Sequence, residues 1–331
     1  MRQRIGWLVV TSGTALALVG CGVGSEGAGG DPGAELLHVS SSRAAARPTP
    51  PSCPAGAICS PNWAGYVDYV RPGYESASGC FTVPTVDVAR SKRGSIGMAW
   101  IGIGGYSLSG DRTLIQGGLV IQPSSSSPYQ LFYETVTPDA TQDSRGALVA
   151  PIASTIAAGD RICVSVFYYC TGPYGCGSCD SYFYPCPAPG AYWRVNIGHF
   201  APDGRHIAST NLPNLRFDSG MGSAEFVVEA PILRRNRTYA ELPQLGTVGF
   251  VPLPAFPAGS TMCPYQPTPP TAPCPAGGLV TSLDYAIPLT LFNPSLSLSA
   301  VPSSLSSAYN NRFNVCVGPT ANPPSCAPPA P

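Results

Sequence analysis

Two glutamates, Glu225 and Glu229, lie in the stretch GSAEFVVEAP, whose other residues are small or apolar. Side chains alternate between the two faces of a β-strand, so Glu225, Val227 and Glu229 would share one face of a strand. The apolar residues between them would form the other face, which suits a core. Such acids either turn to solvent or lie in a cleft, where apolar neighbours hold a carboxyl for acid–base chemistry.

The spacing of the two acids limits what they do together. Four residues of strand separate them by about 13 Å, whereas the paired carboxyls of glycosidases lie about 5–9.5 Å apart. At most one of them acts, with a partner from another strand. Gln116, which precedes two glycines, and Glu134, in LFYETV, are candidate partners, although a lone glutamine in a strand is more often a surface residue.

Other hydrolytic chemistries have little support in the sequence. The chain has three histidines, His38, His199 and His206, and no Gly-x-Ser-x-Gly motif for a serine nucleophile. His199 and His206 lack the spacing of a helical zinc site, so each is predicted at a turn or on the surface. Asp218-Ser219-Gly220 resembles one loop of the aspartic peptidases, but that mechanism needs two such loops.

Composition excludes nucleic acid as a partner. The net charge is zero, 11% of residues are charged and Lys92 is the single lysine, so no cationic patch can follow a phosphate backbone. The apolar fraction of 44% together with 37 Gly and 38 Pro indicates a packed core with many turns.

The N-terminus has the features of an export signal. Arg2 and Arg4 precede an apolar run that ends in Leu-Val-Gly-Cys at Cys21, a sequence that resembles a bacterial lipobox. We expect a lipoprotein signal peptide over residues 1–20 and lipidation of Cys21, which would anchor the protein to a membrane. An ordinary secretory signal is the alternative, and both place the protein outside the cytoplasm.

Cysteine usage agrees with an oxidising compartment. Without Cys21, 12 of the 13 cysteines remain, an even number. Cys263 with Cys274 and Cys316 with Cys326 are plausible local pairs. The Cys176-x-x-Cys179 spacing fits half of a zinc knuckle or a redox pair, but structural disulfides are the favoured interpretation outside the cytoplasm.

Turn-rich strand patterns predict an all-β fold. Short β-branched and aromatic runs alternate with turn clusters, and no helix-length stretch keeps a 3.6-residue apolar period. This favours a two-sheet antiparallel β-sandwich or barrel. We expect a low-complexity tether at 21–58, the β domain at 59–318 and a Pro-rich tail at 319–331. The strand candidates are GCFTVPTV, IGMAWIGI, TLIQGGLVIQ, YQLFYETVT, RICVSVFYY, AYWRVNIGHF, AEFVVEA, LGTVGFV and RFNVCVG.

Six motifs in order resemble the glutamic peptidases (eqolisins): SPNWAGYV, AWIGIGG, LIQGG, LFYETVTP, GSAEFVVEAP and LGTVGF. The resemblance implies a concanavalin A-like jelly-roll β-sandwich with a concave active-site face. It implies a catalytic pair at Gln116 and Glu225, and substrate-binding residues at Trp63, Trp100 and Glu134. It also implies polypeptide substrates, activity at acid pH and no metal or cofactor, and a monomer is expected.

The implied chemistry suits these residue types. Ionised Glu225 would take a proton from the water that attacks the scissile carbonyl and return it to the leaving nitrogen. Gln116 would donate from its amide to the developing oxyanion without needing to titrate.

Four departures from the family pattern surround the pair. Gly104 stands where the family has an acid in GIDG, and Phe132 stands where a tryptophan is frequent. Gly117-Gly118 replaces a Thr-Gly pair, and Ile121-Gln122 occupies the neighbourhood of a second acid. Each would change the surroundings of the pair and not the pair itself.

Three readings follow for function. The first is a membrane-anchored acid endopeptidase outside the cytoplasm. The second is a catalytically decayed, lectin-like surface lipoprotein that binds peptides or glycans. The third is a structural envelope lipoprotein in which Glu225 merely faces solvent.

Overall fold

The computed structural model describes residues 39–40, 55–69, 74–136, 148–149, 154–170, 192–212, 215–233, 237–252, 279–280, 283, 286–306 and 312–329. The chain divides into two compact units, 1–31 and 32–331, and all described residues lie in the second unit, which is the one described below. Cys21, His38, the Cys176–Cys179 motif and the predicted Cys263–Cys274 pair lie outside the described residues.

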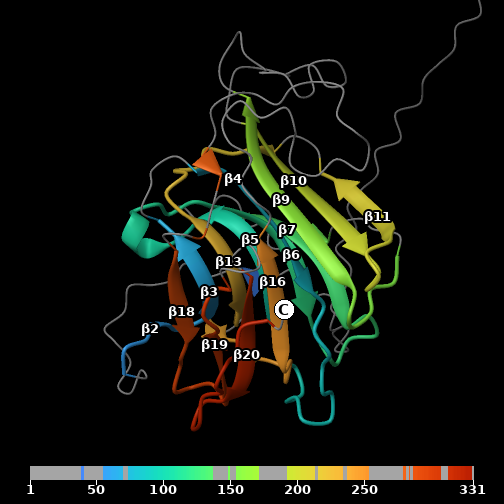
Figure 1. Cartoon of the computed structure of the whole chain (residues 1–331), viewed down its shortest axis with the longest axis vertical. Coiled ribbons are helices and arrows are strands. Elements are labelled where there is room, and N and C mark those ends of the chain that lie inside the picture. Colours follow the sequence, from blue (N-terminus) through green and yellow to red (C-terminus); the bar gives the residue numbers. More distant parts are fainter. Residues whose placement is uncertain are drawn as a thin grey trace, which may run out of the picture. The chain divides into compact units, whose positions relative to one another are not determined.

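Strands make up nearly all of the regular structure (Figure 1). The described residues include the short 3₁₀-helix η1 (Ser107–Ser109) and no α-helix. No helix within them is long and apolar enough to cross a membrane. The strands are β1 (Val39–Ser40), β2 (Ile58–Ser60), β3 (Trp63–Asp68), β4 (Tyr74–Thr82), β5 (Gly97–Gly104), β6 (Leu114–Ile121), β7 (Tyr129–Val136), β8 (Leu148–Val149), β9 (Arg161–Cys170), β10 (Tyr192–Phe200), β11 (His206–Asn211), β12 (Leu215–Arg216), β13 (Ala224–Glu229), β14 (Ile232–Leu233), β15 (Thr238–Tyr239), β16 (Thr247–Pro252), β17 (Leu279–Val280), β18 (Ile287–Leu291), β19 (Leu298–Pro302) and β20 (Phe313–Pro319).

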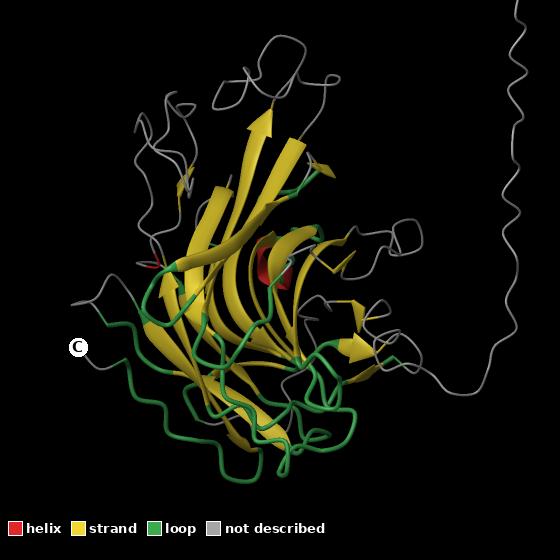
Figure 2. Ribbon diagram, turned by 90° about the vertical axis from the view of Figure 1, so that its right-hand side faces the viewer, coloured by secondary structure: helices red, strands yellow, loops and turns green. Residues whose placement is uncertain are grey.

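The main sheet is built on one continuous antiparallel ladder, and the short strands β2 and β17 pair in parallel with β18 and β4. Its first half runs β8-β7-β6-β5-β13-β3-β18, and its second half runs β19-β20-β16-β4-β9-β10-β11. The halves are joined where Leu291 of β18 pairs with Ala300 of β19. Figure 2 shows how strongly the strands bend, so the ladder curls back on itself. Each of the nine predicted strands overlaps an observed one, in β4, β5, β6, β7, β9, β10, β13, β16 and β20, although GCFTVPTV is a strand only as far as Thr82.

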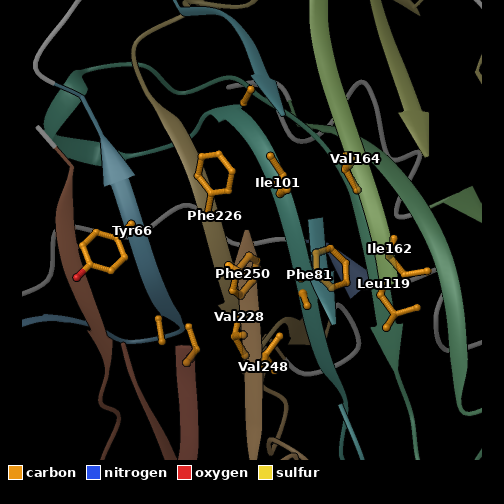
Figure 3. Packing of buried hydrophobic residues seen from close by; sticks show 14 of the residues in the cluster. Tyr66, Phe81, Ile101, Leu119, Ile162, Val164, Phe226, Val228, Val248 and Phe250 are labelled. Atoms are coloured by element: carbon orange, nitrogen blue, oxygen red, sulfur yellow. The ribbon is translucent and has the colours of Figure 1, made fainter. Parts of the chain in front are cut away.

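The two halves face each other across one apolar core, as in a β-sandwich. Phe226 of β13 and Ile101 of β5 lie opposite Phe250 of β16 and Phe81 of β4 (Figure 3). Phe250 also stacks on Phe313 of β20, with ring centroids 5.0 Å apart. Each fully buried phenylalanine contributes up to about 3 kcal/mol. This packing confirms that the alternate apolar residues of AEFVVE face the core.

Outside this ladder, β1 pairs with β14, and β14 pairs with β15, in a separate three-stranded sheet. Val39–Ser40 lies within the segment expected to be a tether, so part of that segment pairs with the chain directly after β13.

Two disulfides that join described residues tie strands and tail together. Cys316–Cys326 is confirmed, and it holds the tail against β20, where the side-chain amide of Asn314 also donates to the carbonyl of Ala327 at 2.9 Å. Cys80–Cys163 links β4 to β9 at directly paired positions. The sequence did not indicate this second pair, because its partners are 83 residues apart.

His199 corrects a sequence prediction. It was expected at a turn or on the surface, but it lies in β10 with no exposed surface. Its Nε2 lies 2.7 Å from Oδ2 of Asp160, and its Nδ1 lies 2.8 Å from the hydroxyl of Ser154. The backbone N–H of Ala157 donates to the same Asp160 oxygen at 2.8 Å. The network therefore fastens the loop before β9 to the sheet.

Replacing His199 with leucine should destabilise the protein. The change leaves the buried Asp160 without its side-chain partner, which costs about 3 kcal/mol, and urea unfolding should measure the loss. His206→Leu is the matched control, because His206 is exposed on β11, and it should change the free energy of unfolding by less than about 0.5 kcal/mol. Equal stability of the two variants would contradict a structural role for the network.

Candidate active site

The face of the first half-sheet that points away from the core carries the predicted site. Alternation places Gln116, Glu134, Glu225 and Glu229 on the same face as a second apolar cluster. We call this face the site face. The apolar cluster that packs on this face, the site-face cluster, comprises Trp63, Val67, Ile96, Met98, Trp100, Tyr106, Leu114, Val120, Phe132, Val227, Ala240 and Leu289.

Strand register brings Gln116 and Glu225 to either side of one glycine. Gly102 of β5 pairs with Glu225 of β13 on one side and with Gln116 of β6 on the other. The two outer backbones are therefore about 10 Å apart, twice the spacing of neighbouring strands. A Cβ at Gly102 would lie 2.9 Å from the Cβ of Gln116 and 3.1 Å from the Trp100 ring. Only glycine leaves the space between the two side chains open.

Glu134 orients the amide of Gln116. The two residues are a directly opposed pair on β6 and β7, and Nε2 of Gln116 donates to Oε2 of Glu134 at 2.8 Å. Both side chains are buried, Gln116 with no exposed surface. The resemblance implied that Glu134 binds substrate, whereas in this structure it contacts the candidate oxyanion donor.

Glu225 is a buried acid whose carboxyl lacks hydrogen bonds. It has no exposed surface, and neither carboxyl oxygen has a hydrogen-bond partner among the described residues. Burial raises the pKa of Glu225 well above its usual value, the nearby Ser223 hydroxyl opposes that rise, and the negative charges of Asp111 and Asp68 add to it. A solvent-facing Glu225, which the third functional reading required, is therefore wrong.

Glu229 has a different role from Glu225. Its Oε2 accepts from the indole N–H of Trp100 at 2.8 Å, and its Oε1 accepts from the amide of Asn62 at 3.2 Å. Trp100 in turn packs edge-on against Trp63, with ring centroids 5.1 Å apart. Glu229 thus fixes the two predicted substrate-binding tryptophans. Sequence reasoning missed Asn62, although it stands directly before Trp63 in the NWAG motif.

The site face is covered in this structure. Tyr106, Ala240 and the half-buried Leu233 come from segments outside β3, β5, β6, β7 and β13, and they pack on the site-face cluster. The sequence predicted a concave face for substrate, but the predicted residues Trp63, Trp100, Gln116 and Glu225 have no exposed surface. Among the described residues, no cluster of three His, Cys, Asp or Glu side chains could hold a metal ion.

A family model matches the segment that carries most of this site. Residues 61–171 match the Peptidase A4 family, the family of glutamic peptidases. Trp63, Trp100, Gln116 and Glu134 lie within the match, and Glu225 lies beyond it. The match agrees with the resemblance that the motifs indicate over this segment.

One solved structure is similar, a crystal structure of scytalido-glutamic peptidase with a peptide based transition state analog. The identity is 16%, the alignment covers 78% of this chain and 98% of that chain, and the TM-score is 0.48. At these values the likeness establishes neither the activity nor the details of the fold. No curated protein matches the sequence.

Neutralising Glu225 should stabilise the protein at neutral pH. A carboxyl whose folded pKa is raised stabilises the fold most below its unfolded pKa and loses that contribution as pH rises through the folded pKa. Glu225→Gln should therefore raise Tm at pH ~7 by at least about 2–4 °C, and by much less at pH ~4. Calorimetry at both pH values measures this difference.

Glu241→Gln is the contrasting control. Glu241 is partly exposed and pairs with Lys92 at 2.5 Å, so its variant should lose a little stability at neutral pH. A Glu225→Gln protein that is less stable than wild type at neutral pH would show that the carboxylate has stabilising partners.

Proposed function

We propose that this protein is an endopeptidase in which Glu225 acts as general base and acid and Gln116 stabilises the oxyanion. One observation carries the proposal: a buried carboxyl without a hydrogen-bond partner lies on the same face as Gln116, with Gly102 between them. The family match over residues 61–171 agrees with this chemistry.

The reaction needs water and these two side chains. Ionised Glu225 takes a proton from a water molecule as the water oxygen attacks the scissile carbonyl carbon. One N–H of the Gln116 amide donates to the carbonyl oxygen as it becomes negative, which is worth about 3–4 kcal/mol. Glu225, now protonated, gives its proton to the leaving nitrogen, and the carbon–nitrogen bond breaks. Glu134 holds the Gln116 amide in orientation.

The substrate binds on the site face, which is one face of a jelly-roll β-sandwich. Trp63 and Trp100 are large apolar surfaces held at a fixed angle by Glu229, and they suit contact with peptide side chains. A peptide reaches them when the side chains over the site face move aside. The lipobox-like sequence supports a location outside the cytoplasm, with the protein held to a membrane by lipid on Cys21, and we propose that the protein is a monomer.

Loss of either reacting side chain should remove cleavage. Glu225→Gln should lower kcat by about 10²–10⁴-fold as a lost general base, and Gln116→Ala by about 10²–10³-fold as a lost oxyanion donor. Digestion of a denatured protein, followed by gel and by release of amino groups, measures both. Gln130→Ala, a half-buried glutamine on β7, is the matched control and should retain activity. Wild-type rates in both site variants would refute the assignment.

The pH profile should report the burial of Glu225. Below its pKa the carboxyl is neutral and accepts no proton, so kcat/KM falls as the solution becomes acidic. Because burial raises that pKa, the acid limb should lie above the ordinary glutamate value of about 4.3. We therefore expect activity in mildly acidic solution, measured with a fluorogenic peptide. An acid limb at or below the ordinary value would contradict Glu225 as the base in this environment.

The same assays test the binding-module reading. A decayed, lectin-like protein would retain peptides or glycans and release no product at any pH. Tight retention by both wild type and Glu225→Gln, without turnover by either, would favour that reading over the peptidase.

A further inference from the structure

Asp111 lies in a cradle of three glycines beside the site. It stands between η1 and β6, and 9% of its surface is exposed. A Cβ added at Gly104 would lie 2.8 Å from Oδ2 of Asp111, and a Cβ added at Gly220 would lie 2.5 Å from its Oδ1. A Cβ added at Gly222 would lie 2.7 Å from the Cβ of Asp111. Gly104 also has a φ of +89°, which other residues rarely adopt. The chain is thus built closely around this carboxylate.

The carboxylate binds the segment that leads into β13. Oδ2 of Asp111 accepts from the backbone N–H of Gly222 at 2.9 Å, and Oδ1 accepts from the N–H and hydroxyl of Thr113 at 2.8 and 2.6 Å. The Thr113 hydroxyl oxygen accepts from the N–H of Gly220 at 2.8 Å. The N–H of Gly104 donates to the carbonyl of Ser223 at 2.8 Å. Residues 220–223 are therefore fixed directly before Glu225.

We propose that Asp111 is a positioning residue for the reaction, which acts through Glu225 by fixing the entry to β13 and by placing a carboxylate near the general base. This inference rests on the proposed function of Glu225. It also accounts for one departure in the sequence, because the acid that is missing at Gly104 is matched by a carboxylate that reaches the same place from another segment.

The effect of Asp111 on the pKa of Glu225 depends on the other charged groups around Glu225. Asp68 on β3 is the other acid that raises the pKa of Glu225, after burial itself, and Asp68 accepts from the Tyr74 hydroxyl at 2.5 Å. On β5, Glu225 is paired with Gly102, which carries no charge. The next strand, β6, presents the neutral side chain of Gln116, and Glu134 on β7 accepts a hydrogen bond from that side chain. Removing the charge of Asp111 therefore lowers the pKa of Glu225, so the base stays ionised in more acidic solution.

The test is the pH profile of Asp111→Asn. We expect its acid limb of kcat/KM to move to lower pH, together with a lower kcat because one loop hydrogen bond is lost. A purely structural role would lower kcat/KM by the same factor at every pH. Asp203→Asn is the matched control: Asp203 is exposed, its Oδ1 accepts from the N–H of Arg205 at 2.9 Å, and its loss should leave the limb in place.

Thr113→Val separates position from charge. It removes the hydroxyl that links Asp111 to Gly220 but keeps the carboxylate, so kcat should fall by about fivefold while the acid limb stays. An unchanged kcat in this variant would overturn the positioning role, including in the case that Asp111→Asn fails to fold.

A measurement that needs no catalysis distinguishes the role of Asp111 from the proposed peptidase function. Carbon-13 NMR of labelled glutamate follows the titration of Glu225, which Glu225→Gln assigns. A lower pKa in Asp111→Asn supports the inference even if wild type cleaves nothing, which would refute only the proposed function. An unchanged Glu225 titration in folded Asp111→Asn overturns the role of the charge.

Discussion

The site depends on the antiparallel register of three strands, β13, β5 and β6. That register places Glu225, Gly102 and Gln116 in one row across the sheet. A shift of one residue in either ladder would turn a reacting side chain into the core, because strand faces alternate. The apolar residues between the site positions, such as Phe226 and Ile101, pack in the core and so fix the register. Core packing and catalysis are thus set by the same alternation.

Two glutamates on one strand face, Glu225 and Glu229, differ because their neighbours differ. Glu229 pairs across the ladder with Trp63 and Met98, and its oxygens accept from an indole and an amide. Glu225 pairs with Val67 and Gly102, which have no donors in their side chains. An unpartnered buried carboxyl costs stability, whereas a partnered one does not. A fold retains such a cost where function uses it.

The sequence predicted the strands and the shared face but not the register. Period-two alternation in AEFVVE needs no knowledge of neighbours, so the core and site faces followed from it directly. Of the strands of five or more residues, β3, β11, β18 and β19 were not predicted: β3 is buried on both faces and contains a glycine, and β11 is largely polar. Gly102, Asp111 and the His199 network depend on contacts between distant segments, which no local pattern encodes. The Cys316–Cys326 disulfide could be predicted from the sequence because only a short segment separates the two cysteines.

Access of a peptide to a buried site is compatible with a stable sheet. The covering residues Tyr106, Ala240 and Leu233 belong to connecting segments and the short β14–β15 hairpin, not to the central strands. Moving them breaks few backbone hydrogen bonds of the main ladder, so it costs far less than unfolding the sheet. Glu225 and Gln116 sit on central strands held from both sides and would keep their geometry during such a motion. Covering also excludes water, which strengthens the interaction between an oxyanion and the Gln116 amide.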